Sequence, residues 1–302
     1  MLEKILQDAH FVQEHSQDVV VHEDVIDTFV KDFAPGEFWL KSNPFHVLDM
    51  SLRDLISFLL VYHTIGDYCF WGDPKWMIQT EDGVLDGSFA IMKLVIQEFQ
   101  ERGNFNLTLD EFQDLLKGNV EIPLLKERYE QLQILNTYLQ NHSFYDEIAD
   151  FNDDVTLFSY LIDYFPYFKD ESTYEGRTIS FYKRAQLLTS DILHVKEMKG
   201  IPVDYTHLVG CADYKIPQVM NSYGMMTYSD SLDQMIAAKT EIPEGDAYEV
   251  EIRANTLAVI DSIYQKLGGK VPRMDINDSI WLLGQNKQKV KKLYHCTKTT
   301  HY

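Results

Sequence analysis

The sequence predicts a mostly α-helical protein with little β structure, and three observations support this prediction. Apolar residues recur at three- and four-residue steps in nearly every periodic segment of the chain. Several of these segments begin at a capping residue and end at glycine or proline. Strand-like segments are scarce, and two-residue hairpin signals are missing. We therefore expect a helical bundle that forms one unit over residues 1–302, either undivided or with a cleft between two helical subdomains.

The first half of the chain contains one ambiguous segment and two clear helices. The segment "QDVVVHE" (residues 17–23) is apolar and β-branched, so it fits either a strand or the start of a helix. Residues 108–118 are predicted to be helical, because Thr108 and Glu111 have the spacing of a capping box. A second helix is expected after Pro123, where apolar residues follow with helical spacing.

The second half is predicted to contain three further well-marked helices. Residues 152–165 form a helix with Asp153 or Asp154 as its cap. Residues 245–269 form a long helix that ends at two consecutive glycines. Residues 277–284, "NDSIWLLG", form a short capped helix.

The net charge of −20 argues against a nucleic acid as the partner. Affinity for a nucleic-acid backbone comes largely from Lys and Arg side chains that neutralise several phosphates. The most basic segment, "KQKVKK" (residues 287–292), fits a solvated helix end better than a basic stripe. We therefore expect no duplex nucleic acid as a partner. A single phosphate group is a different case, because two or three local cations suffice to bind it.

Cysteine usage and hydropathy predict a soluble cytoplasmic protein without a metal site. Cys69, Cys211 and Cys296 lie far apart and form no CxxC pair or His/Cys cluster that would indicate zinc. The start of the sequence has no signal-peptide form. The apolar run "LISFLLVY", which begins at Leu55, is far shorter than the roughly 20 residues that span a membrane.

Two segments carry unusual polar residues. "SFYKRAQLLTSDI" (residues 180–192) places two aromatic residues next to two cations at the start of an amphipathic helix. Asp213 lies between an apolar run and a helix expected to begin at Pro217. A carboxylate drawn out of water near helix N–H groups makes a base or stabilises a cation. A helix cap is the alternative interpretation of Asp213.

Two further groups of side chains leave alternatives open. Glu249 and Arg253 are four residues apart on a predicted helix, where they form either part of a site or a surface salt bridge. Phe70, Trp71 and Trp76 either pack in the core or form a stacking face for a flat heterocycle.

Five segments occur in a fixed order and together resemble one protein family. They are "DESTYEGRTISFYKRAQLLTSDI", "ADYKIPQVMNSYGMMTYSDSL", "YEVEIRANTLAVIDSI", "DINDSIWLLG" and "YHCTKTTHY". Their order resembles the queuosine salvage protein family, the queuosine 5′-phosphate N-glycosylase/hydrolases. The resemblance extends over residues 35–302.

The resemblance implies both a fold and an activity. Family members are mostly helical and similar in fold to helix-hairpin-helix DNA glycosylases. The implied reaction is hydrolysis of the N-glycosidic bond of queuosine 5′-phosphate, with queuosine itself as a second candidate substrate. It releases the 7-deazaguanine base queuine for reuse in tRNA modification, and no metal or organic cofactor is implied. The family motif A-D-Y-[KR]-x-P-Q places its Asp at Asp213, and the motif F-Y-K-R-A-Q places its Lys at Lys183.

This chain departs from the family pattern in two places. Asp67 stands before "YCFW" where the family usually has Asn. The family's C-terminal pattern resembles H-R-T-R, and here it is His295, Cys296, Thr297 and Lys298. One arginine is lost and one is replaced by lysine, which bears on phosphate contacts at the tail.

The implied chemistry gives Asp213 a catalytic role. Cleavage of an N-glycosidic bond develops positive charge on the ribose. A carboxylate near C1′ stabilises that charge and orients or deprotonates the attacking water. Because a 7-deazapurine has no N7 to protonate, activation is expected from the sugar side or from hydrogen bonds to the guanine-like edge.

The same implied substrate assigns binding roles to other residues. Lys183, with Arg184 or Tyr182, is expected to hold the 5′-phosphate or the ribose oxygens. Adjacent helical residues point about 100° apart, so we expect Lys183 to face the ligand while Arg184 pairs with an acid elsewhere. Phe70 and Trp71 are expected to stack on the base.

Six more residues complete the expected substrate contacts. Queuine carries a cationic amine and a cyclopentenediol, which suit acidic partners. The remaining candidates are Asp67, Tyr214, Asp230, Glu249, His295 and Lys298.

Three other functions remain open at this point. The first is an N-glycosidase for another nucleoside or for a base in DNA, although the charge of −20 disfavours DNA. The second is a non-catalytic binder of a modified nucleotide, in which Asp213 is purely structural. The third is a helical scaffold, which leaves the tyrosine-rich loops and the adjacent cations unexplained.

Overall fold

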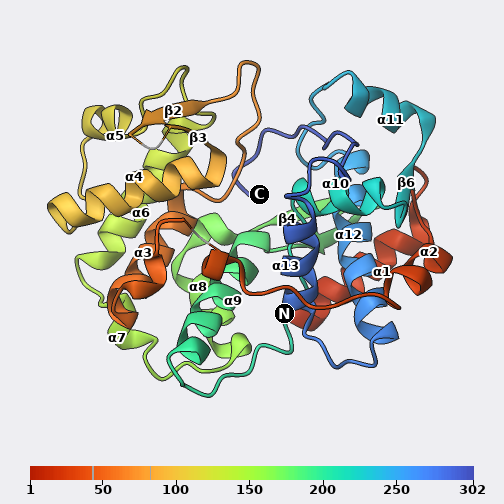
Figure 1. Cartoon of the computed structure of the whole chain (residues 1–302), viewed down its shortest axis with the longest axis horizontal. Coiled ribbons are helices and arrows are strands. Elements are labelled where there is room, and N and C mark those ends of the chain that lie inside the picture. The colour runs from red at the N-terminus through yellow and green to blue at the C-terminus, as the bar shows by residue number, and fades with distance from the viewer. Residues whose placement is uncertain (43, 82) are drawn as a thin grey trace.

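The protein is predominantly helical in the computed structural model, as predicted (Figure 1). The structure describes residues 1–42, 44–81 and 83–302. In these ranges the α-helices are α1 (Leu2–His15), α2 (Glu23–Phe29), α3 (Leu52–Ile65), α4 (Gly87–Arg102), α5 (Leu109–Leu115), α6 (Leu125–Leu139), α7 (Phe144–Glu147), α8 (Asp154–Tyr164), α9 (Lys183–Met198), α10 (Lys215–Ser222), α11 (Asp230–Ala237), α12 (Ala247–Lys266) and α13 (Arg273–Leu283). The short 3₁₀ helices are η1 (Trp39–Ser42), η2 (Val47–Asp49) and η3 (Pro166–Phe168).

The β structure consists of small antiparallel pairs. The strands are β1 (Val19–Val21), β2 (Met77–Thr80), β3 (Gly83–Asp86), β4 (Glu171–Tyr174), β5 (Arg177–Ser180) and β6 (Met226–Tyr228). The ambiguous segment 17–23 supplies β1, which pairs with β6 from the far end of the chain. The pairs β2–β3 and β4–β5 are hairpins that the sequence analysis missed. The β4–β5 turn uses Glu175 and Gly176 with φ of 48° and 75°, in place of the more recognisable Asn-Gly.

Helix caps define most of the predicted helices. The capping box of Thr108 and Glu111 is present at α5, and Asp153 caps α8 by accepting the N–H of Thr156. The predicted start of the short helix at residue 277 is wrong, because α13 already begins at Arg273. Asn277 and Asp278 therefore lie inside the helix, where their side chains can contact neighbouring elements instead of capping it.

Helices from distant parts of the sequence lie side by side (Figure 1). Helix α1 packs along α12, which brings the N-terminal helix beside a helix from the C-terminal part of the sequence, and α3 packs against α4, α6 and α9. One group of helices contains α3 to α7, the other contains α1, α2 and α10 to α13, and α9 runs between them.

The buried side chain of Arg184 fixes the C-terminal end of α3. The last carbonyl groups of a helix have no partner within that helix. Arg184 donates to the carbonyl oxygens of His63, Thr64 and Thr300, which joins α3 to the C-terminal tail. It also donates to the amide oxygen of Gln131. Arg184 thus points away from Lys183, as predicted, but the expectation that it pairs with an acid is wrong.

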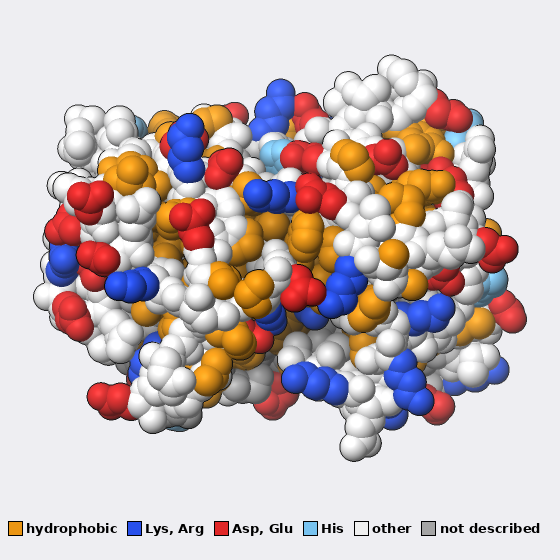
Figure 2. All heavy atoms as spheres, turned by 90° about the horizontal axis from the view of Figure 1, so that it is seen from above, with side chains coloured by type: hydrophobic (Ala, Val, Ile, Leu, Met, Phe, Trp, Pro, Cys, Tyr) orange, Lys and Arg blue, Asp and Glu red, His pale blue; other side chains and the backbone are white. Residues whose placement is uncertain are grey.

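The described side chains on the face seen in Figure 2 mix acidic and basic groups. No helix in the described ranges is both long and apolar enough to cross a membrane. The absence of a duplex nucleic acid partner stays a prediction.

Replacing Arg184 by methionine is expected to destabilise the fold strongly. The carbonyl oxygens of α3 and the tail would lose their donors inside the protein, at about 1–3 kcal/mol each. We expect urea unfolding to show a loss of about 3 kcal/mol or more in the free energy of unfolding. Arg53→Met is the control, because the Arg53–Asp146 pair is exposed. Equal stability of the two variants would contradict this role.

Candidate active site

A cavity of about 520 Å³ lies between the two groups of helices. Ligand-binding pockets typically have volumes of about 300–1,000 Å³. Its walls come from the loop after α3, the start of α9, the turn before α10, and α13 with the residues that follow it. Five of the predicted site residues line it, and these are Asp67, Phe70, Lys183, Asp213 and Tyr214.

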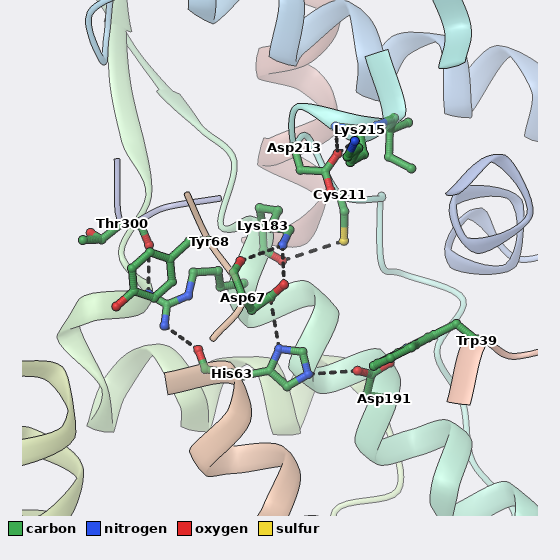
Figure 3. Close-up of polar contacts among 12 residues, drawn as sticks. Trp39, His63, Asp67, Tyr68, Lys183, Asp191, Cys211, Asp213, Lys215 and Thr300 are labelled. Carbon is green, nitrogen blue, oxygen red and sulfur yellow. Dashed lines mark hydrogen bonds and ion pairs between the residues drawn. The ribbon is translucent and has the colours of Figure 1, made fainter. Parts of the chain in front are cut away.

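Lys183 and Asp67 form a buried ion pair on the cavity wall (Figure 3). The Lys183 Nζ lies 2.8 Å from Asp67 Oδ1 and 3.1 Å from the Asp67 carbonyl oxygen. Burial opposes the charge of each group. The Asp67 and Asp213 carboxylates nevertheless raise the pKa of Lys183, while Lys183 and His63 hold the pKa of Asp67 well below its usual value. Both groups are therefore charged at neutral pH.

The ion pair continues into a chain of hydrogen bonds behind the cavity (Figure 3). His63 is fully buried, and its Nδ1 lies 3.0 Å from Asp67 Oδ2 while its Nε2 lies 2.9 Å from Asp191 Oδ2. The indole of Trp39 donates to the other Asp191 oxygen at 2.9 Å. An ionised carboxylate only accepts hydrogen bonds, so both His63 nitrogens must donate. The two carboxylates also raise the pKa of His63, which favours this protonated form.

Asp213 combines the two roles that its sequence position left open. Its Oδ1 accepts the N–H groups of Lys215 at 2.8 Å and Ile216 at 2.9 Å, so one oxygen caps the start of α10. Among the described residues, no hydrogen bond engages its Oδ2. Burial raises the pKa of Asp213, against the opposing effects of Lys183 and the two N–H groups. The carboxylate is therefore a stronger proton acceptor than an ordinary Asp, with one oxygen available to a ligand.

Helix α13 contributes an acid and an amide that the sequence analysis missed. Both Asn277 and Asp278 line the cavity. Asn277 accepts the N–H of Cys211 at 3.0 Å and donates to Asp278 at 3.3 Å. Burial, helped by the negative charge of Asp191, raises the pKa of Asp278 to about 7. The sequence analysis missed both residues because it placed the start of the helix at residue 277, where they would serve as caps.

The aromatic wall contains one of the two predicted stacking residues. Phe70 lines the cavity, and its ring packs on Trp76 with the ring centroids 6.5 Å apart. Trp71 lies outside the cavity lining and donates its indole N–H to the Thr297 carbonyl oxygen at 2.9 Å. Tyr214 lies beside Tyr294, which the sequence analysis had not selected, at a centroid distance of 5.0 Å.

Five other predicted substrate contacts lie outside the cavity lining. Tyr182 is buried and donates to Glu171, and His295 is buried beside the Tyr302 hydroxyl. Asp230 and Lys298 are exposed. Glu249 is fully buried in a separate network. The five predicted contacts that do not line the cavity are therefore Tyr182, Asp230, Glu249, His295 and Lys298.

The network around Glu249 supports the cavity from behind. Arg253 lies 3.4 Å from Glu249 and makes two closer contacts, of 2.6 and 2.9 Å, with Asp170. Its guanidinium also lies 4.3 Å from the ring centre of Tyr302, which lines the cavity. The interpretation of Glu249 and Arg253 as a surface salt bridge is therefore wrong, because both side chains are buried.

Over residues 1–42, 44–81 and 83–302, no group of three or more His, Cys, Asp and Glu side chains is arranged to hold a metal ion.

Comparison with known proteins places this site in a family. The family model described as queuosine salvage protein matches residues 46–302. The chain belongs to the queuosine salvage protein family. The resemblance found in the sequence motifs is thereby confirmed, and the match includes every residue of the cavity lining except Trp39.

Curated relatives match over most of their length. A protein of Sphaerobacter thermophilus is 30% identical, with 99% of this chain and 97% of the relative covered. Proteins of Nematostella vectensis and Mus musculus are 28% and 26% identical, with 85% and 86% of this chain and 81% and 84% of the relative covered. Each of the three is named queuosine 5′-phosphate N-glycosylase/hydrolase.

The ring of His63 is expected to be doubly protonated at pH 7. Burial lowers the pKa of this histidine, but its hydrogen bonds to Asp191 and Asp67 outweigh burial and raise it above the usual value. Nitrogen NMR of histidine-labelled protein should show doubly protonated rings at pH 7, and one of these signals should belong to His63. His63→Asn should remove that signal. A neutral His63 ring at pH 7 would contradict the proposed hydrogen-bond chain.

Proposed function

We propose that this protein hydrolyses the N-glycosidic bond of queuosine 5′-phosphate and releases queuine in queuosine salvage. Family membership and the names of the relatives support this reaction. The observation that carries the proposal for this chain is Asp213. This carboxylate lines the cavity, keeps one oxygen available, and has a raised pKa near the buried cation of Lys183.

Asp213 is the proposed catalytic residue of this hydrolysis. Water adds its oxygen to C1′ as the bond between C1′ and the base nitrogen breaks, and the bonding electron pair leaves with the base. One proton of the water is lost and one proton is gained by the base, so the reaction balances. The free oxygen of Asp213 stabilises the positive charge on the ribose and accepts the proton of the water.

Lys183 is proposed to control the charge of Asp213. Its ammonium opposes the effect of burial on the pKa of the Asp213 carboxyl and so favours the ionised form. The pairing with Asp67 and the hydrogen-bond chain through His63 hold the ammonium in place. Lys183 also offers a donor to the ribose, while Asp67 remains a candidate partner for the cationic amine of the base.

The leaving base is proposed to be held by polar and aromatic groups. Asp278, with a pKa of about 7, can donate or accept a hydrogen bond at neutral pH, which suits the guanine-like edge. Phe70 and Tyr214 line the same cavity and offer their ring faces. This arrangement supports loss of a base that has no N7 to protonate.

We infer that the chain acts as one unit, with the cavity between two helical subdomains. The helical content supports, at the level of fold class, the implied similarity to helix-hairpin-helix DNA glycosylases. We also propose a cytoplasmic location and a reaction that needs no metal or organic cofactor.

Asp213→Asn is expected to lower the rate of queuine release by about 10²–10³-fold. This is the scale seen when one preorganised electrostatic group is removed from an active site. The amide keeps an oxygen for the N–H groups of Lys215 and Ile216, so the fold should be preserved. Free queuine is quantified by mass spectrometry after incubation with queuosine 5′-phosphate.

Asp110→Asn is the matched control, because Asp110 is exposed on α5, outside the cavity lining. It should release queuine at the wild-type rate. Near-normal turnover by Asp213→Asn would remove Asp213 from the mechanism. Thermal stabilisation of the wild type by the substrate without any release would favour a nucleotide-binding protein instead.

A further inference from the structure

Besides Lys183, three lysines from separate segments line the cavity. Lys75 follows the aromatic loop after α3, Lys215 begins α10, and Lys287 lies in the segment after α13. Lys287 belongs to "KQKVKK", the most basic stretch of a chain whose net charge is −20. The fold thus gathers cations around one cavity in an acidic protein.

These lysines differ in how well their charges are neutralised. Lys75 lies 2.7 Å from Asp86 in an exposed ion pair. No carboxylate of the described residues lies within ion-pair distance of Lys215 or Lys287. The Lys215 ammonium contacts the amide oxygen of Gln218 only at 3.5 Å, and it lies 4.5 Å from the ring centre of Tyr294. The aromatic ring positions this ammonium without neutralising it.

The surroundings of Lys215 favour the binding of an anion. Burial lowers the pKa of Lys215, and the positive charges of Lys75 and Lys287 lower it further, against the effects of Asp213 and Asp86. Like charges held close together repel one another, and a bound anion would relieve that repulsion. Lys183 differs, because its side chain is only 3% exposed and is already paired with Asp67.

We propose that Lys215 and Lys287 form a binding site for the phosphate monoester of the nucleotide. This inference rests on the proposed function, and it specifies which residues of the cavity bind the phosphate. From the sequence, Lys183 with Arg184 or Tyr182 was expected to hold the phosphate or the ribose oxygens. Of these three residues, only Lys183 lines the cavity, and the tail residues His295 and Lys298 also lie outside the lining.

The position of Lys215 relative to Asp213 supports this assignment. The two residues are two positions apart in one turn, and Asp213 accepts the N–H of Lys215 at 2.8 Å. In a nucleotide, C1′ and the 5′-phosphate lie at opposite ends of the ribose. A ribose with C1′ beside the Asp213 carboxylate can therefore extend its phosphate toward the ammonium of Lys215. The same turn would serve both the reacting carbon and the phosphate.

Lys215→Gln is expected to lower kcat/KM for queuosine 5′-phosphate by about 10- to 100-fold, as expected for the loss of a hydrogen bond to a charged group. The value for queuosine, which lacks the phosphate, should change by less than about threefold. Lys287→Gln should act in the same direction with a smaller effect, because Lys287 is exposed to solvent. The readout is the ratio of the kcat/KM values for queuosine 5′-phosphate and queuosine. A general loss of folding would lower both values and leave their ratio unchanged.

Lys291→Gln is the control, because Lys291 is an exposed lysine of the same basic segment that lies outside the cavity lining. It should leave the ratio unchanged. Equal losses on both substrates in Lys215→Gln would overturn the phosphate site while leaving the hydrolysis intact. Failure of the wild type to release queuine from either substrate would instead contradict the proposed function.

Binding of ribose 5-phosphate tests the anion site without turnover. Calorimetry should show binding to the wild type and about tenfold weaker binding to Lys215→Gln. Ribose without the phosphate should bind more weakly than ribose 5-phosphate to the wild type. Equal affinity of ribose 5-phosphate for the wild type and Lys215→Gln would overturn the proposal.

Discussion

The burial of charged side chains behind the cavity is the constraint on which the rest of the site depends. A charge removed from water is unfavourable unless it is paired and hydrogen-bonded. Lys183, Asp67, His63 and Asp191 meet this condition only as a continuous chain, in which each group satisfies its neighbours. Because the chain connects α3 with α9, loss of one member would leave another charge buried without a partner. The geometry of the cavity wall is therefore fixed by electrostatic necessity as well as by packing.

This buried chain gives two neighbouring carboxylates different properties. Asp67 touches Lys183 and His63, which keep it ionised with a lowered pKa. Asp213 is farther from these hydrogen bonds, and burial raises its pKa. One acid therefore holds the cation in place, while the other is left to accept a proton or stabilise positive charge. The cavity lining also includes Lys75, Lys215 and Lys287, whose charges are neutralised less completely than that of Lys183.

The sequence predicted the helical class and the central pair of the site, but not the surroundings of that pair. Asp213 and Lys183 stood out because they lie at turns beside apolar runs, and motif order reinforced them. Arg184 was misassigned because its partners are carbonyl oxygens at a helix end, which leave no pattern in side-chain composition. Asp278 was missed because the start of its helix was placed too late. Trp71 was expected in the cavity because sequence does not reveal which of two adjacent aromatic rings turns inward.

The central claim is that Asp213 faces the reacting carbon of the nucleotide. A crystal structure of the Asp213→Asn protein with queuosine 5′-phosphate would test it most directly, because the weakened reaction should leave the substrate intact. The account predicts C1′ beside residue 213, the base toward Asp278, and the phosphate at Lys215. A nucleotide bound outside the cavity would contradict this assignment. So would a nucleotide with its phosphate at Lys183 and its base beside Lys215 and Lys287.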